Sequence, residues 1–94
     1  MSGDDYPAGT RFVEIDPDVI FRRVDDELVL VKIASNEIFA LNPTGGRIWE
    51  SLSEGSDIDR TVELLLETYD APEEEVRLEV ESFVAELRRQ GFIR

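Results

Sequence analysis

Residues 27–49 read ELVLVKIASNEIFALNPTGGRIW, and this stretch decides the fold. Residues 27–33 and 37–41 are rich in the β-branched and aromatic side chains that favour strands. Residues 34–36, Ala-Ser-Asn, have the chemistry of a tight turn. The stretch therefore predicts two antiparallel strands joined by a short turn and followed at once by a helix.

The start of that helix is marked by Pro43. Proline has no N–H to give to a sheet, and it suits the first turn of a helix. Either of its neighbours, Asn42 or Thr44, can act as the N-terminal cap. Gly45 and Gly46 weaken the helix locally, and we expect them to let its start pass close to another backbone.

Both faces of the predicted hairpin are apolar. Alternate residues of a strand face opposite sides, and in residues 28–31, Leu-Val-Leu-Val, both sets are apolar. A chain of this length can cover only one face of the sheet with its helices. The second face, or the free edge beside it, is a candidate docking surface.

The rest of the chain adds one strand before the hairpin and two helices after its first helix. Residues 1–9 read as a loose tail, ahead of a single domain over residues 10–94 that opens with a short extended segment at 10–15. The expected strands are 19–24, 27–33 and 37–41, and the expected helices run over 43–52, from Asp57 or Asp59 to Tyr69, and from Pro72 or Glu73 to about Gln90. Three strands followed by three helices indicate an α+β fold with a three-stranded antiparallel sheet.

The composition argues against several classes of function. The chain has 22 acidic and 10 basic residues and a net charge of −12, which disfavours nucleic acid and anionic membranes as partners. It has no His and no Cys, so the usual general base, thiol nucleophile and zinc ligands are missing. No apolar stretch reaches the roughly 20 residues of a membrane span. We therefore expect a cytoplasmic protein that is not an enzyme, uses no cofactor, and has a neutral, basic or apolar partner.

The acidic clusters and the paired glycines do not match known sites. The carboxylates at 25–27, 57–59 and 73–75 lack the spacing of a calcium loop. We interpret those at helix starts as stabilising the helix dipole. Gly45-Gly46 lacks the spacing of a phosphate-binding loop.

The third strand carries the main functional hypothesis. In a meander it lies at the edge of the sheet, so its backbone N–H and C=O groups are free unless another segment covers them. An extended peptide could pair with this edge and place alternate side chains in pockets. The alternative is that residues 10–15 fill the edge.

The last helix has apolar residues on two sides. One side is a stripe that we assign mostly to the core, made of Val76, Val80, Phe83, Val84 and Leu87. Leu78 and Ala85 lie on the opposite side, either as scattered surface residues or as the lining of a groove.

Two adjoining motifs point to a family. Residues 41–45 read Leu-Asn-Pro-Thr-Gly, and residues 48–52 read Ile-Trp-Glu-Ser-Leu. Three later segments follow in order, VELLLETY (62–69), VESFVAEL (80–87) and GFI (91–93). In these motifs, and over residues 16–93, the chain resembles the PqqD-like family, whose stand-alone members are recognition elements for ribosomally made precursor peptides.

The resemblance implies a winged-helix-like domain with a peptide partner. Members of the family bind the leader segment of a precursor peptide as a fourth strand beside the third strand, packed against the third helix. The peptide-binding residues implied for this chain are Val31, Ile33, Asn36, Glu37, Ile38, Phe39, Ala40 and Leu41 in the sheet, and Val76, Arg77, Val80, Glu81 and Val84 in the helix. The implied partners are the leader peptide and a leader peptidase, a cyclase or both.

Two subtypes of the family remain open, together with a rival class. Residues 26–30 and 45–49 look more like the lasso-peptide type, often called B1, which implies a leader whose Tyr fills an apolar pocket between sheet and helix. The alternative is the chaperone of pyrroloquinoline quinone synthesis, which usually has Pro-Glu-Gly where this chain has Ala-Ser-Asn at 34–36. The rival class is an acidic winged-helix regulatory or dimerisation domain. In a dimer of that kind, two third strands would pair with each other along the free edge.

Overall fold

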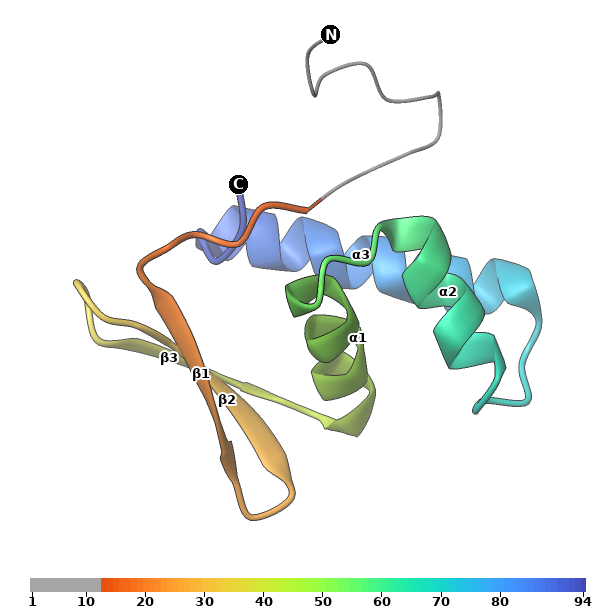
Figure 1. Cartoon of the computed structure of the whole chain (residues 1–94), viewed down its shortest axis with the longest axis horizontal. Helices are drawn as coiled ribbons and strands as arrows, with labels where there is room; N and C mark the ends of the chain where they lie inside the picture. Colours follow the sequence, from red (N-terminus) through yellow and green to blue (C-terminus); the bar gives the residue numbers. More distant parts are fainter. Residues whose placement is uncertain (1–12) are drawn as a thin grey trace, which may run out of the picture.

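The computed structural model describes residues 13–94, which form three strands followed by three helices. The strands are β1 (Val19–Val24), β2 (Glu27–Lys32) and β3 (Glu37–Leu41), and the helices are α1 (Pro43–Ser53), α2 (Ile58–Leu66) and α3 (Glu73–Gln90). In Figure 1 the sheet lies on one side of the molecule, α1 stands between the sheet and α2, and α3 passes behind α1 and α2. The predicted α+β order is confirmed. The predicted tail, residues 1–9, lies outside the described residues.

The sheet is an antiparallel meander in the order β1-β2-β3. Its two turns contain Asp25 at φ 56° and Asn36 at φ 60°, in the left-handed region that Asp and Asn adopt more readily than most side chains. β2 ends at Lys32, one residue earlier than predicted. The N–H of Asn36 donates to the carbonyl of Lys32 at 2.8 Å and closes the turn there.

The register of the sheet decides which side chains face the helices. Residues paired across an antiparallel ladder share a face. Leu28 pairs with Leu41 and Leu30 pairs with Phe39, and these side chains form the inner face, against the helices. The residues between them form the outer face, where Val31 pairs with Ile38.

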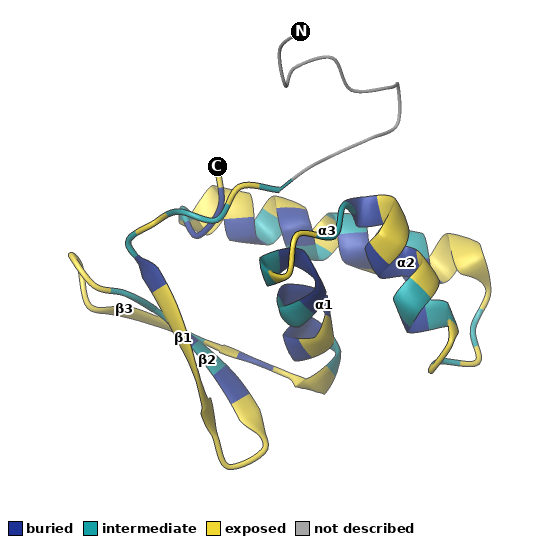
Figure 2. Cartoon of the chain, in the orientation of Figure 1, coloured by how far each residue is buried: buried dark blue, intermediate teal, exposed yellow. Residues whose placement is uncertain are grey.

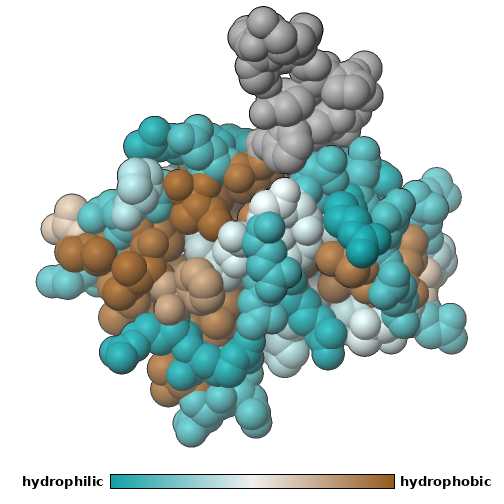
Figure 3. All heavy atoms as spheres, in the orientation of Figure 1, coloured by the Kyte–Doolittle hydropathy of each residue, from teal (hydrophilic) through white to brown (hydrophobic). Residues whose placement is uncertain are grey.

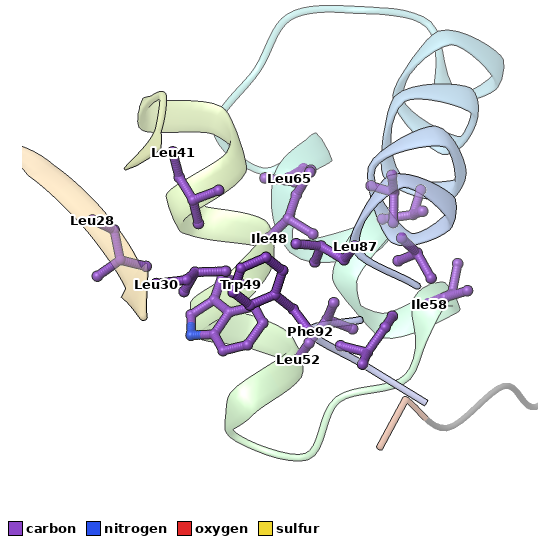
Figure 4. Close-up of a cluster of buried hydrophobic side chains, with 14 of the residues drawn as sticks. Leu28, Leu30, Leu41, Ile48, Trp49, Leu52, Ile58, Leu65, Leu87 and Phe92 are labelled. Atoms are coloured by element: carbon purple, nitrogen blue, oxygen red, sulfur yellow. The ribbon is translucent and has the colours of Figure 1, made fainter. Parts of the chain in front are cut away.

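The core fills the space between the inner face and the three helices (Figure 2). Trp49 of α1 is fully buried, and Phe21 of β1 meets its ring edge-on with the ring centroids 5.9 Å apart. Figure 4 shows the Trp49 ring among side chains from the sheet, from α1 and from the end of the chain, including Leu30 and Phe92. Phe92 and Ile93, at the end of the chain, are also buried in this core.

The segment before β1 pairs with the C-terminal end of the chain. Ile15 forms a β-bridge with Ile93, the N–H of Asp16 donates to Phe92, and the N–H of Arg94 donates to Glu14. The described part of the extended segment predicted at 10–15 therefore lies away from β3, and residues 10–12 of it lie outside the described residues.

The cap of α1 is Asn42 rather than Thr44. The Oδ1 atom of Asn42 accepts a hydrogen bond from the N–H of Gly45 at 2.7 Å, as expected of an N-cap followed by proline. The hydroxyl of Thr44 lies 3.3 Å from the hydroxyl of Tyr69 instead. Through the cap, the end of β3 and the start of α1 are held in one fixed corner.

Candidate functional site

The outer edge of β3 presents unpaired backbone groups. The N–H of Ile33 donates to Asp18, on the β1 side of β2. Because backbone direction alternates along a strand, the even-numbered residues of β2 then point to β3, and their partners in β3 are Glu37, Phe39 and Leu41. The N–H and C=O groups of Ile38 and Ala40 consequently point outward. Within residues 13–94 no strand pairs with them.

A hollow lies directly beside this edge. It has a volume of about 230 Å³ and lies where the end of β3, the first turns of α1 and the middle of α3 meet. Its lining residues are Phe39, Ala40, Leu41, Asn42, Gly45, Ile48, Glu79 and Phe83. We call the β3 edge together with this hollow the edge groove. A strand added to β3 would carry every second side chain toward the hollow.

The depth of the hollow depends on Gly45. A Cβ atom at this position would lie 3.1 Å from the Phe83 ring and 3.2 Å from Oδ1 of Asn42. Glycine thus lets the Phe83 ring lie against the first turn of α1. The sequence led us to expect another backbone close to the two glycines, and in both cases the atoms nearest to an added Cβ belong to side chains. The neighbour of Gly45 is an aromatic side chain, and that of Gly46 is Cβ of Leu28 at 3.5 Å.

The predicted sheet residues divide between the two faces. Phe39, Ala40 and Leu41 line the hollow, and the Leu41 side chain is also part of the core. Val31 and Ile38 lie on the outer face, and Ile38 is not among the residues that line the hollow. Three others lie at the turn end of the hairpin, namely Ile33 and Asn36, both exposed, and Glu37, whose carboxylate lies 3.9 Å from Lys32.

The predicted helix residues lie mostly beneath the surface. Val76, Val80 and Val84 are all buried in the core. Arg77 is bound by carboxylates of its own chain, with 2.7 Å to Asp59. That hydrogen bond raises the pKa of Arg77 and keeps its guanidinium occupied. Contact of these three valines and Arg77 with a bound peptide stays a prediction. The same holds for Glu81, which is half-buried.

Glu79 and Phe83 form the helix wall of the edge groove, and the sequence did not single them out for this role. Phe83 belongs to the stripe that we assigned mostly to the core, and it is only half-buried. The sequence feature that could have indicated this role is the position of Phe83 at the margin of the apolar stripe, one helical turn from Glu79. Leu78, considered as a possible groove residue, is 65% exposed and lines none of the cavities found in the described residues.

The outer face of the sheet is largely apolar, and no helix within residues 13–94 covers it. Ile20, Val24 and Ile38 are 45%, 51% and 70% exposed, and Val29, Val31 and Ala40 lie among them. Figure 3 shows hydrophobic side chains gathered over the strands, on the left of the view. The predicted second apolar face is therefore present. It meets the edge groove along β3.

The described residues contain neither a candidate metal-binding cluster nor a candidate membrane-spanning helix. Between residues 13 and 94, no three His, Cys, Asp or Glu side chains are placed to share a metal ion. No helix in that part of the chain has the length and apolar character needed to cross a bilayer.

Comparison with known proteins finds similar solved structures and a matching family model. A search of curated protein sequences gives no match. The structure of TbiB1 in complex with the TbiA(beta) leader peptide is similar, with a TM-score of 0.82 and 26% identity over 86% of this chain and 94% of that one. A lasso peptide synthetase B1 complexed with its leader peptide gives a TM-score of 0.83 at 20% identity, over 88% of this chain and 98% of that one, and shares the fold.

The family model for coenzyme PQQ synthesis protein D (PqqD) matches residues 27–93, from the start of β2 to the last buried residue. That range includes β3, the capped corner at Asn42 and both walls of the edge groove. The chain therefore belongs to the PqqD family.

Proposed function

We propose that this chain binds the leader segment of a ribosomally made precursor peptide in lasso-peptide biosynthesis, as a fourth strand on β3. The observation that carries the proposal is that the outward N–H and C=O groups of Ile38 and Ala40 lie beside an open, partly aromatic hollow. The similar proteins that bear leader peptides support it. The protein acts by binding and not by catalysis.

Two kinds of interaction in the edge groove would contribute to the affinity for a peptide. Each hydrogen bond to the β3 edge is worth about 0.5–1.5 kcal/mol net. An apolar side chain seated between Phe39 and Phe83 adds about 1.5–3 kcal/mol. After the costs of association, these terms fit a dissociation constant between micromolar and nanomolar.

The outer face is the proposed surface for partner enzymes. We infer that a leader peptidase, a cyclase or both dock on the apolar outer face, around Ile38 and Val31, and receive the precursor there. Side chains of the added strand that point away from the hollow would extend this face. The setting proposed for this assembly is the cytoplasm.

A second candidate is the peptide chaperone of pyrroloquinoline quinone synthesis, which the description of the matching family favours. Both candidates bind a peptide at the same edge, and the identity of the peptide separates them. Capture of the precursor from the producing organism, followed by mass spectrometry, would distinguish a lasso precursor from a quinone precursor.

Selection from a displayed library of random linear peptides tests the binding itself. We expect the wild-type protein to enrich peptides with a common apolar anchor, and the TbiA(beta) leader to compete with them. Gly45→Ala is expected to weaken the enriched peptide by about 1 kcal/mol, roughly five-fold, because the new Cβ drives the Phe83 ring into the hollow. Titration calorimetry measures the change.

Gly46→Ala is the matched control. It adds the same methyl group to the same helix turn, but at an ordinary contact distance from Leu28. Both variants gain about 1 kcal/mol of helix propensity, so neither should unfold. Equal affinities for the two variants would count against the hollow as the anchor site, and failure of the wild type to enrich any peptide would overturn the proposed function.

A further inference from the structure

We propose that the edge groove continues into a second, smaller cavity that selects a lysine or arginine of the bound peptide, with Glu75 and Glu79 as specificity-determining residues. The inference rests on the proposed function and adds the chemistry of a second peptide position. The cavity, which we call the side pocket, lies between the first turn of α1, the end of α2 and the start of α3. It is lined by Thr44, Leu65, Tyr69, Ala71, Glu75, Val76 and Glu79.

The side pocket adjoins the edge groove. Glu79 lines both cavities, so they lie on the two sides of one side chain. In the chain, Asn42 and Gly45 border the groove and Thr44 borders the side pocket, all within the capped corner. A peptide that pairs with β3 and runs on past Leu41 therefore meets the side pocket next.

The size of the side pocket favours an alkyl chain. Its volume is about 90 Å³, whereas a cavity of about 150 Å³ is known to take a benzene ring. Its inner wall is apolar, formed by the buried side chains of Leu65 and Val76. The stem of a lysine or arginine fits such a space better than an aromatic ring does.

The rim of the side pocket favours a cationic end group. Glu75 and Glu79 are exposed and one turn apart on α3, where like charges repel. In the described part of the chain neither carboxylate has an ion pair or hydrogen bond. Two neighbouring cations contact groups other than these two carboxylates. Arg77 is bound to Asp59 and Glu73, and Arg47 lies 6.0 Å over the ring of Tyr69 and is not part of the lining.

These features together match a long basic side chain. Its methylene stem would cover the apolar wall while its charged head reaches the two carboxylates. A neutral or acidic residue at the same position would leave the repulsion between Glu75 and Glu79 unrelieved or increase it. The net charge of −12 adds a long-range preference for a basic peptide.

The test uses peptides enriched from a displayed random library by the wild-type protein. Lysine or arginine is expected at a fixed distance from the apolar anchor. In a synthetic copy of the best peptide, replacing that lysine by norleucine keeps the stem and removes the charge. On the wild type this is expected to weaken binding about three- to ten-fold, less at high salt.

Two protein variants complete the comparison. The double variant Glu75→Gln/Glu79→Gln is expected to bind the lysine and norleucine peptides equally. Glu74→Gln removes a carboxylate from the same end of α3 without touching either cavity, and it is expected to keep the preference for lysine. Two outcomes would overturn this inference alone. One is that the enriched peptides share the apolar anchor but no basic residue, and the other is that the double variant still prefers the lysine peptide. Absence of any enriched peptide would overturn the proposed function as well.

Discussion

Replacing Ala40 with proline is expected to weaken peptide binding about a hundred-fold while the domain stays folded. The outward N–H of Ala40 is lost, and the proline ring occupies the space into which a peptide carbonyl would come. The loss of one or two hydrogen bonds, with a peptide carbonyl left unpaired, is expected to reduce the free energy of binding by about 3 kcal/mol. Calorimetric titration of an enriched peptide measures the loss.

The fold should tolerate this proline because of the register of β3. Ala40 gives no N–H to β2, and edge strands accept proline where the N–H faces away from the sheet. Ala40→Val is the matched control, because it adds bulk of similar size and keeps the N–H. Equal binding by the proline and valine variants would show that the β3 backbone takes no part in recognition.

The second large effect concerns stability. Trp49→Ala is expected to lower the free energy of unfolding by about 3–5 kcal/mol, because a fully buried indole at the centre of the core would leave a cavity. That is a large share of the stability of a small domain. Urea denaturation followed by circular dichroism is the suitable measurement, because Trp49 is the chain's single tryptophan and fluorescence is lost with it.

Trp49→Phe should cost far less than Trp49→Ala. The Nε1 atom of Trp49 is buried and has no hydrogen-bond partner in the described part of the chain. Phenylalanine removes this unpaired donor and retains most of the ring volume, so the two effects partly offset each other. A phenylalanine variant as unstable as the alanine variant would mean that the ring volume it retains does not stabilise this core.

The strands and the first helix could be predicted because local chemistry determines them. β1 and β3 have the predicted bounds, and α1 begins at Pro43 as proline requires. The choice between Asn42 and Thr44 as cap could not be made, since both side chains are suitable. It depends on the tertiary contact between Thr44 and Tyr69.

The walls of the edge groove were harder to predict than its edge. A free third strand follows from the strand order alone, and periodicity correctly placed Val76, Val80 and Val84 on one helix face. Periodicity does not say how deeply that face is covered. Helix α2 packs against α3, and the margin of that face, at Glu79 and Phe83, stays open beside β3.

The regular part of α2 ends at Leu66, earlier than the apolar spacing suggested. The N–H groups of Thr68 and Tyr69 both donate to the carbonyl of Leu65, which tightens the last turn. This turn sets Tyr69 into the side pocket. A pattern of apolar spacing cannot show such a tightening, because it leaves the spacing of the side chains almost unchanged.

Amide hydrogen exchange followed by NMR, with and without an enriched peptide, tests the central claim most directly. Addition of a strand to β3 predicts slower exchange at the outward amides of Ile38 and Ala40, and no comparable change at Phe21 and Arg23, the outward amides of the opposite edge. If exchange at Ile38 and Ala40 stays unchanged in the saturated complex, the peptide does not pair with β3.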